Sequence, residues 1–129
     1  MITTRATLWI GRVLSTLPVL LLVMSAAMKF SGSPQVLEVF VGKLGYPQGT
    51  LVGLGILELS CTILYVIPRT AVLGAILLTG YLGGAITTHL RGGEVFWGPL
   101  VLGILVWAGL YLRDERIRAL IPLRQRAAR

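Results

Sequence analysis

The side chains that could do chemistry are few, and the most unusual is Glu58, which lies in the middle of an apolar stretch. Cys61, Thr62 and Tyr65 follow it at positions i+3, i+4 and i+7, so all four share one face of a helix. A carboxyl group in apolar surroundings is either protonated or paired with a cation or a hydrogen-bond donor. We therefore expect a polar stripe with Glu58 at its centre, directed toward the interior of the protein.

The partners of Glu58 must come from other parts of the chain. Tyr81 lies at a comparable depth in the next apolar stretch, and its phenol can donate a hydrogen bond to the carboxyl group. Lys29, His89 and Arg91 lie near the ends of apolar stretches. Their side chains can reach inward, although such side chains ordinarily extend outward to water. We predict that these five residues form a ligand-binding group.

The sequence leaves two interpretations of Glu58 open. The carboxyl group either orients a ligand or relays a proton in a polar pocket, or it holds two helices together through hydrogen bonds. Cys61 is expected to be a small packed residue, and His89 an interfacial or loop-bonding histidine. One histidine and one cysteine do not make a cluster of metal ligands, so we expect no metal site.

The elements that position these residues are long and apolar. Of the 129 residues, 55% are hydrophobic and 13% are charged, and the mean hydropathy is +0.82. A soluble domain of this size cannot bury so much apolar surface, which indicates a single transmembrane domain over residues 1–129. Four stretches are long and apolar enough to cross a bilayer as helices, namely 8–30, 50–67, 71–90 and 95–112. The predicted fold is an all-α, integral membrane four-helix bundle.

A short amphipathic helix is expected after the first of these stretches. Its apolar residues recur at helical spacing: Val36, Leu37, Phe40, Val41 and Leu44. Pro34 suits the first position of a helix, and Gly45 suits its C-terminal cap. We predict a helix over 34–44 that lies on the membrane surface, covers the bundle or packs on the loops.

The distribution of charge predicts the orientation. With four spans, both termini lie on the same side of the membrane, together with most of the basic residues. These are Arg5, Arg12, Arg69, Arg113, Arg116, Arg118, Arg124, Arg126 and Arg129, whereas the other side holds Lys29, Lys43 and Arg91. The positive-inside rule then makes both termini cytoplasmic, in a bacterial-type inner membrane. We expect the basic tail, 113–129, to meet anionic headgroups rather than nucleic acid, because no nucleic-acid-binding motif accompanies the charge.

Small residues are concentrated in the third stretch. Gly80 and Gly84 form a GxxxG pair with Gly83 beside them, a pattern that lets helix backbones approach closely. We expect these three glycines to pack helices together, chiefly within the bundle. Since GxxxG pairs are common in apolar sequence, the pattern does not by itself predict a homo-oligomer.

Residues 80–91, GYLGGAITTHLR, resemble the third-span signature of the DoxX-like membrane proteins. The resemblance runs from about Ser15 to Pro122 and includes the segments 43–47, 58–70 and 107–114. It implies a small protein with four spans. The family takes its name from a subunit of a thiosulfate:quinone oxidoreductase, and its members resemble partners in membrane-associated oxidoreductase complexes. Glu58, Lys29, His89 and Arg91 match positions at which the family pattern often has polar residues.

Three functions remain open at this point. The first is a membrane subunit or anchor of a redox-linked complex that binds a quinone or another lipid-like ligand between the second and third spans. The second is a non-catalytic assembly, chaperone or cargo-handling protein, whose partner is another membrane protein. The third is a small transporter. A self-sufficient enzyme is disfavoured, because the sequence has no nucleophile–base pair, metal cluster or phosphate-binding loop.

Overall fold

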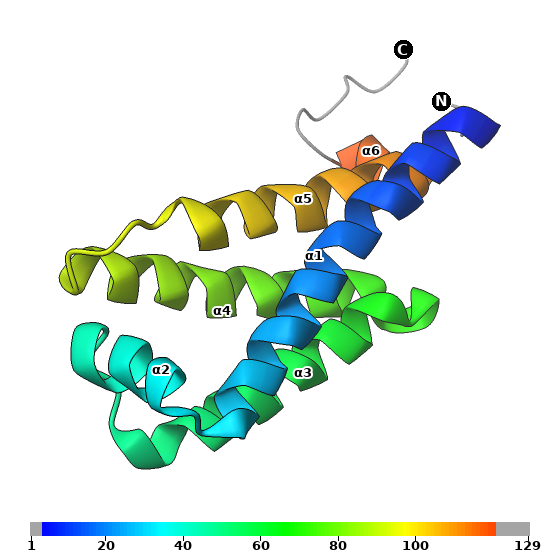
Figure 1. Cartoon of the computed structure of the whole chain (residues 1–129). Helices are drawn as coiled ribbons and strands as arrows, with labels where there is room; N and C mark the ends of the chain where they lie inside the picture. Colours follow the sequence, from blue (N-terminus) through cyan, green and yellow to red (C-terminus); the bar gives the residue numbers. More distant parts are fainter. Residues whose placement is uncertain (1–3, 121–129) are drawn as a thin grey trace.

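The structure is a computed structural model that describes residues 4–120, except for the side chain of Gln48. All regular secondary structure in this part of the chain is helical. Its four long helices are α1 (Arg5–Ser31), α3 (Leu51–Val66), α4 (Ala71–Arg91) and α5 (Trp97–Arg113). α1 packs against α3 and α5, and α4 packs against the same two helices, so the four close into a ring (Figure 1).

Shorter helical segments precede or follow the long helices. They are α2 (Pro34–Leu37), the π-helical turn η1 (Glu38–Lys43), the 3₁₀ turns η2 (Gln48–Thr50) and η3 (Pro68–Thr70), and α6 (Glu115–Leu120). The start of α1, the turn between α3 and α4, and α6 lie at one end of the bundle, which we call the α6 end (Figure 1). α2 and η1 lie at the opposite end, the α2 end.

The helices begin and end at residues that favour such boundaries. Thr4 caps α1, because its Oγ1 accepts a hydrogen bond from the backbone N–H of Thr7 at 3.1 Å. α1 ends at Gly32, whose φ of 61° is costly for any residue with a Cβ. Pro99 lies in the first turn of α5, where no helical hydrogen bond is lost. These local signals place the long helices close to the predicted stretches.

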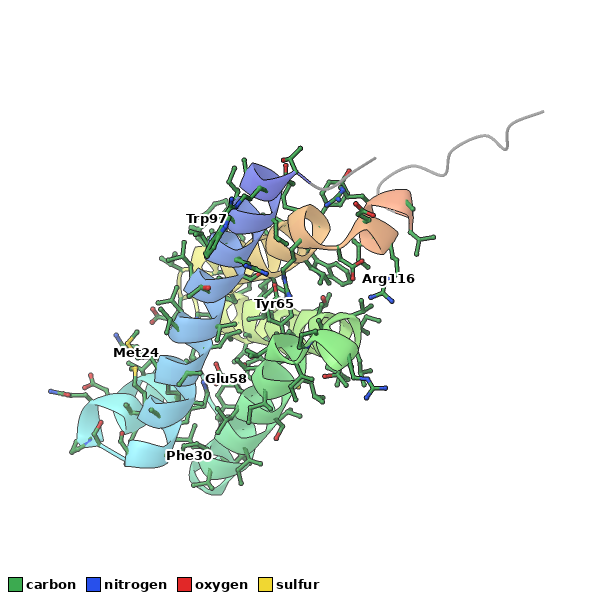
Figure 2. All side chains as sticks on the ribbon, turned by 90° about the vertical axis from the view of Figure 1, so that its right-hand side faces the viewer. Met24, Phe30, Glu58, Tyr65, Trp97 and Arg116 are labelled. Carbon is green, nitrogen blue, oxygen red and sulfur yellow. The ribbon has the colours of Figure 1, made fainter. Side chains whose placement is uncertain are left out.

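The outer faces of all four long helices are apolar. Leu20, Ile56, Ile76 and Ile104, one from each helix, are each more than half exposed. Met24 is also exposed, and its side chain projects outward from α1 (Figure 2). Two helical segments are long and apolar enough to cross a membrane, Arg5–Ser31 and Pro68–Arg91. α3 and α5 are also apolar but shorter, with 16 and 17 residues. Since 16 residues rise only about 24 Å, a crossing by these two helices stays a prediction.

The closest helix contacts are made by glycines. A Cβ at Gly74 would overlap the backbone of Tyr65, and a Cβ at Gly109 would overlap Ser15. α4 therefore meets α3, and α5 meets α1, with almost no side chain between the backbones. Both contacts lie toward the α6 end of the bundle, because Tyr65 is near the end of α3 and Ser15 is in the first half of α1.

The glycines predicted from the GxxxG pattern lie elsewhere. A Cβ at Gly80, Gly83 or Gly84 would meet nothing within 4 Å. The buried face of α4 is formed by other residues, including Leu78 and Leu82, and the three glycines are exposed. They make no close helix contact within the described part of the chain, and their packing against a second chain stays a prediction.

The predicted amphipathic helix is present, with a change of winding. α2 begins at Pro34, and from Glu38 onward the chain continues as the π-helical turn η1. Val36 and Leu44 are buried, and Gly45 follows with a φ of 78°. This segment lies at the α2 end of the bundle (Figure 1), and its position on the membrane surface stays a prediction.

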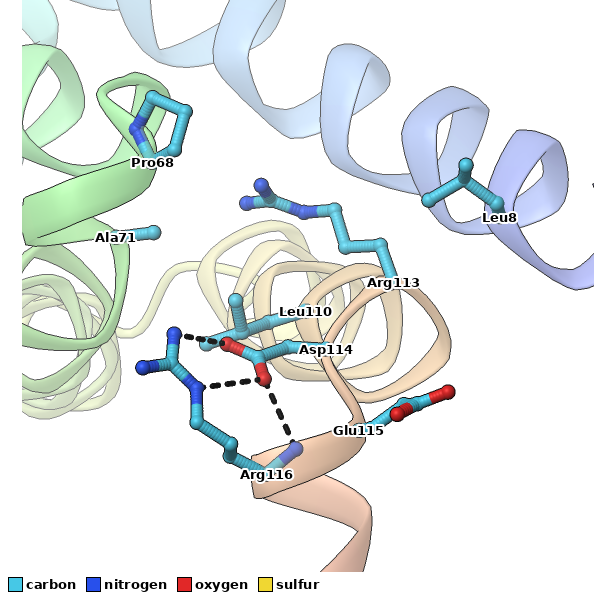
Figure 3. A pocket seen from close by; sticks show the side chains of 8 residues that line it. All are labelled: Leu8, Pro68, Ala71, Leu110, Arg113, Asp114, Glu115 and Arg116. Atoms are coloured by element: carbon cyan, nitrogen blue, oxygen red, sulfur yellow. Dashed lines mark hydrogen bonds and ion pairs between the residues drawn. The ribbon is translucent and has the colours of Figure 1, made fainter. Parts of the chain in front are cut away.

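Asp114 connects α5 to α6. Its Oδ1 accepts hydrogen bonds from the backbone N–H of Arg116 at 3.0 Å and from Arg116 Nε at 3.3 Å (Figure 3). Partial burial favours the neutral acid, but the hydrogen bonds and charge of Arg116 outweigh it and lower the pKa of the Asp114 carboxyl. Ile117 is buried against the core, so α6 folds back onto the bundle. Most of the predicted basic tail, 121–129, lies outside the described residues.

Candidate functional site

The polar stripe predicted on α3 is buried, as the sequence indicates. Glu58, Cys61, Thr62 and Tyr65 are each 3% exposed or less. Thr62 Oγ1 donates a hydrogen bond to the backbone carbonyl of Glu58 at 2.7 Å, and this bond stays within α3. The carboxyl group of Glu58 is therefore free to contact the neighbouring helices.

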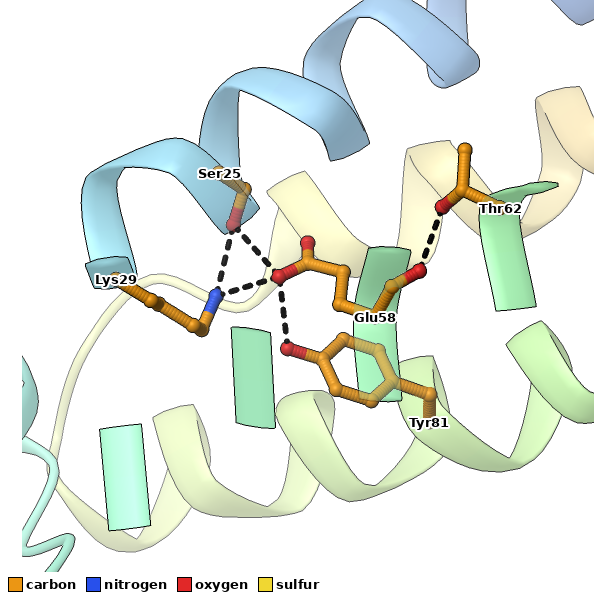
Figure 4. Close-up of polar contacts among 5 residues, drawn as sticks. All are labelled: Ser25, Lys29, Glu58, Thr62 and Tyr81. Atoms are coloured by element: carbon orange, nitrogen blue, oxygen red, sulfur yellow. Dashed lines mark hydrogen bonds and ion pairs between the residues drawn. The ribbon is translucent and has the colours of Figure 1, made fainter. Parts of the chain in front are cut away.

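Lys29 reaches Glu58 from the last turn of α1. Its Nζ lies 2.8 Å from Glu58 Oε2, and the side chains are only 5% and 2% exposed. Ser25, one turn earlier, accepts a hydrogen bond from Lys29 Nζ at 2.8 Å and donates one to Glu58 Oε2 at 3.3 Å (Figure 4). The spacing of four residues puts Ser25 and Lys29 on the same face of α1. Lys29 thus extends into the bundle and not outward to water.

Tyr81 completes the group from α4, as predicted. Its phenol donates a hydrogen bond to Glu58 Oε2 at 3.1 Å. Donors from α1 and α4 therefore converge on a single oxygen of a side chain on α3. Additional hydrogen bonds of this kind are what makes a buried ion pair tolerable in a medium of low dielectric constant. We call Ser25, Lys29, Glu58 and Tyr81 the Glu58 cluster.

The second carboxylate oxygen of Glu58 is in a different position. Oε1 accepts no hydrogen bond from any residue in 4–120, whereas Oε2 accepts three (Figure 4). Within the same residues, every fully buried side-chain nitrogen and oxygen has a hydrogen-bond partner. Since Oε1 has none, it is not fully buried and keeps some accessible surface. Glu58 lines a cavity of about 210 Å³, which leaves a hydrogen-bond acceptor available to a ligand.

This cavity lies at the α2 end, between the long helices and beneath η1. Its polar atoms come from Ser25, Lys29, Tyr46, Glu58, Tyr81 and His89, and leucines form much of the remaining wall. Phe40 of η1 places its ring 4.7 Å from Lys29 Nζ. Tyr46 is joined to α4, because its phenol donates a hydrogen bond to Thr88 Oγ1 at 3.0 Å. The segment after α1 therefore forms the cover of the cavity.

His89 lines the cavity and Arg91 does not. His89 Nδ1 lies 2.6 Å from the carbonyl oxygen of Ala85, which can only accept a hydrogen bond. Nδ1 must then carry the proton, which leaves Nε2 for another partner. Arg91 is exposed at the end of α4 and takes no part in the cavity wall. The structure thus brings together Glu58, Lys29, Tyr81 and His89, four of the five predicted residues.

Three further residues of the cavity are not predicted by the sequence. Ser25 has a usable signal, because it precedes Lys29 by four residues on a helix. Phe40 is part of the predicted apolar stripe, but its contact with Lys29 depends on how η1 folds back toward α1. Tyr46 lies in the loop beyond, where helical periodicity predicts no neighbour.

The family model of the DoxX-like family matches residues 13–109, which contain the whole Glu58 cluster and the cover of the cavity. Searches of curated proteins and of solved structures found no match. The resemblance of residues 80–91 to this family is confirmed, since the matched range includes them. With its outward-facing apolar helices, this chain is a membrane protein that belongs to the DoxX-like family.

Proposed function

We propose that this protein binds the polar head of a lipid-like molecule, in the first place a quinone, in the cavity beside Glu58. In this proposal it serves as a membrane subunit or anchor of a redox-linked complex. The observation that carries the proposal is the asymmetry of the Glu58 carboxyl group. Oε2 is held by three donors, whereas Oε1 is left without one beside a cavity.

The chemistry of the cavity suits a ligand with a hydroxyl group. Oε1 can accept a hydrogen bond from such a hydroxyl, for example that of a quinol. Because the three donors fix the carboxyl group, a ligand bound to Oε1 would be held in one orientation. His89 Nε2 supplies a second polar atom in the same wall. A ligand with two oxygen atoms on one ring can use both contacts.

The size and surroundings of the cavity favour a molecule with an apolar tail. At about 210 Å³, the cavity is smaller than the usual ligand pocket, so only a head group fits. A groove of about 500 Å³ lies beside it between α4 and α5, and Leu82 and Pro99 line both spaces. Gly83 and Gly103 leave this groove unfilled. A tail leaving the cavity past Leu82 would lie in the groove.

The first test is to identify what the protein binds. The full chain would be purified from its native membrane in mild detergent, and small molecules that purify with it would be identified by mass spectrometry. We expect a stoichiometric quinone or lipid in the wild type and its loss in Glu58→Gln. Arg91→Gln removes a charge at the same end of the bundle but outside the cavity, so it is the matched control. A wild type without any ligand would contradict the proposal.

A second variant is needed because Glu58→Gln also removes the partner of Lys29. His89→Leu changes the cavity wall, and the recorded hydrogen bond of the His89 ring is to its own helix, so the fold should persist. We expect it to weaken binding of an added quinone, measured by fluorescence quenching of the tryptophans. Unchanged binding in both variants would show that the ligand lies elsewhere.

The groove can be tested separately through its glycines. Gly83→Leu and Gly103→Leu should weaken binding of a long-tailed quinone more than that of a tailless analogue, because the new side chains occupy the groove. Gly84→Leu adds the same side chain to α4 outside the lining residues and should leave both affinities unchanged. Equal effects on the two ligands would contradict the path of the tail and leave the head-group site intact.

An assembly role is a second candidate, favoured by one observation. Gly80 and Gly84 are exposed on α4, and a Cβ at either would meet nothing within 4 Å. Such a face allows the close approach of another membrane helix. A cysteine introduced by Gly80→Cys in a Cys61→Ser background should then crosslink to one dominant membrane protein. Crosslinks spread over many proteins would count against this role.

A further inference from the structure

A second group of polar contacts lies toward the α6 end of the bundle. The phenol of Tyr65 is wholly buried, donates a hydrogen bond to the Val106 carbonyl at 2.7 Å and lies 3.0 Å from Ser15 Oγ. Arg113 Nε donates a hydrogen bond to the same Ser15 Oγ at 3.0 Å. The guanidinium carbon of Arg113 lies 5.0 Å from the centre of the Tyr65 ring. We call Ser15, Tyr65 and Arg113 the Tyr65 cluster.

The guanidinium group of Arg113 is fixed on one side and open on the other. The bond from Nε and the ring of Tyr65 hold its plane, whereas the two terminal nitrogens have no acceptor among residues 4–120. Figure 3 shows them in the space between Pro68 and Leu8, in the larger of the two cavities that Arg113 lines. An arginine held in this way presents two parallel donors to a planar or tetrahedral anion.

Arg113 lines two cavities, of about 500 Å³ and 420 Å³. The larger one also includes Asp114, Glu115 and Arg116, so its two carboxyl groups offset the positive charges of its two arginines. The smaller one has no acidic residue in its wall and contains a second cation, Arg12, whose guanidinium carbon lies 5.2 Å from the centre of the Trp9 ring. The smaller cavity is therefore the one that suits a negatively charged group.

The rest of this smaller cavity is suited to hydrocarbon. Val19 and Val66 form part of its wall, and the neighbouring Val13 and Leu17 are exposed on the outer face of α1. Arginine and tryptophan at the end of an apolar helix are typical of the boundary between membrane and water. Basic pockets between helices at this depth are a usual place for acidic lipid headgroups.

We propose that Arg113 and Arg12 bind the phosphate of an anionic phospholipid, whose acyl chains lie against Val19 and Val66. The two terminal nitrogens of Arg113 make the bidentate contact, and Arg12 supplies the second positive charge. Inorganic phosphate offers the same charge without the chains, so it distinguishes an anion site from a lipid site. This site shares no residue with the cavity at Glu58, and either proposal can fail without the other.

The test measures lipid binding by the full chain in a zwitterionic detergent with native mass spectrometry. Phosphatidylglycerol, phosphatidylcholine and inorganic phosphate would be added in turn. We expect binding of phosphatidylglycerol by the wild type, and a loss of affinity of about tenfold in Arg12→Gln, since one charge-assisted contact is removed. The guanidinium of Arg12 lies over Trp9, outside the Tyr65 cluster, so this variant should keep the fold.

Two further variants make the test specific. Arg113→Lys keeps the charge but loses the planar fork, and it should weaken phosphatidylglycerol binding as well. Arg69→Gln removes an exposed charge near the same end of the bundle, outside both cavities, and should leave binding unchanged. Equal losses in Arg69→Gln and Arg12→Gln would overturn the proposal in favour of general surface charge. Equal binding of phosphatidylcholine or of inorganic phosphate would overturn the assignment to an anionic lipid.

Discussion

The central groups of the two polar clusters, the Tyr65 phenol and the Glu58 carboxyl, differ in how completely their hydrogen-bonding capacity is used. In the Tyr65 cluster, the buried phenol is fully used by the Val106 carbonyl and Ser15. In the Glu58 cluster, three donors gather on one carboxylate oxygen and leave the other beside a cavity. A phenol with no unused hydrogen bond can hold helices together, whereas an unused acceptor can also bind a ligand.

The helices pack more closely around the Tyr65 cluster than around the Glu58 cluster. Near the Tyr65 cluster, Gly74 and Gly109 bring helix backbones into direct contact. At Glu58 the helices separate enough to leave about 210 Å³ between them. The hydrogen bonds of Glu58 to side chains of α1 and α4 agree with the interpretation that this carboxyl group links helices. The interpretation that it binds a ligand depends on its second oxygen, Oε1. Variants at the two clusters distinguish these roles.

The largest effect is expected from breaking the buried ion pair. Lys29→Met leaves the Glu58 carboxylate buried without its cation and should lower the free energy of unfolding by about 3–5 kcal/mol. Unfolding would be followed by circular dichroism as a denaturing detergent is added. The double variant Lys29→Met/Glu58→Gln removes both charges and should recover most of the loss. A double variant as unstable as Lys29→Met would contradict the role of the unpaired charge.

The next effect concerns the close helix contact beside the Tyr65 cluster. Gly109→Ala places a Cβ against Ser15, so α1 and α5 must move apart, at a cost of about 1–3 kcal/mol. Gly84→Ala adds the same methyl group where nothing lies within 4 Å and should be neutral or slightly stabilising. Thermal unfolding of the two variants in the same detergent measures the difference. Equal melting temperatures would mean that the contact at Gly109 is not tight.

The sequence predicts the bundle well because its signals are local. Each long helix is an apolar stretch bounded by glycine, proline or a capping residue, and 3.6-residue periodicity places Cys61, Thr62 and Tyr65 on the face of Glu58. Tyr81 is also predictable, since depth in a membrane helix follows from counting residues. These features depend on neighbours within one or two helical turns.

Other features of the site depend on how the helices cross, and the sequence alone does not contain them. The direction of Lys29 depends on α1 passing close to α3. The general tendency of lysine side chains to extend outward to water therefore does not predict its contact with Glu58. The tight glycine contacts occur at Gly74 and Gly109, which have no GxxxG partner, and not at Gly80 and Gly84. Crossing geometry, and not the spacing of small residues, decides which glycine is buried.

A matched pair of tyrosine variants separates the roles of the two clusters. Tyr65→Phe leaves the Val106 carbonyl without its donor and should cost about 1–2 kcal/mol of stability. Tyr81→Phe should cost less, because Lys29 and Ser25 still donate to Glu58 Oε2. For binding of an added quinone, measured by tryptophan fluorescence, the order reverses, since only Tyr81 lines the cavity. Parallel effects of both variants on stability and binding would remove the distinction between the clusters.

The smallest effect is expected at Asp114, whose ion pair with the exposed Arg116 is compared with the buried pair of Lys29 and Glu58. Arg116 lowers the pKa of this carboxyl from its ordinary value of 3.8, so the folded state favours the charged form. Its contribution to stability is therefore present above that value and is lost as the pH falls through the lower pKa of the folded state. Asp114→Asn should melt slightly below the wild type at pH 7, and the gap should narrow as the pH falls below 3.8. Because Arg116 is exposed, solvent and salt screen the pair, and the gap should stay smaller than that of Tyr65→Phe. A gap that does not change with pH would contradict the role of the charge, because asparagine can still accept the hydrogen bond from the Arg116 backbone.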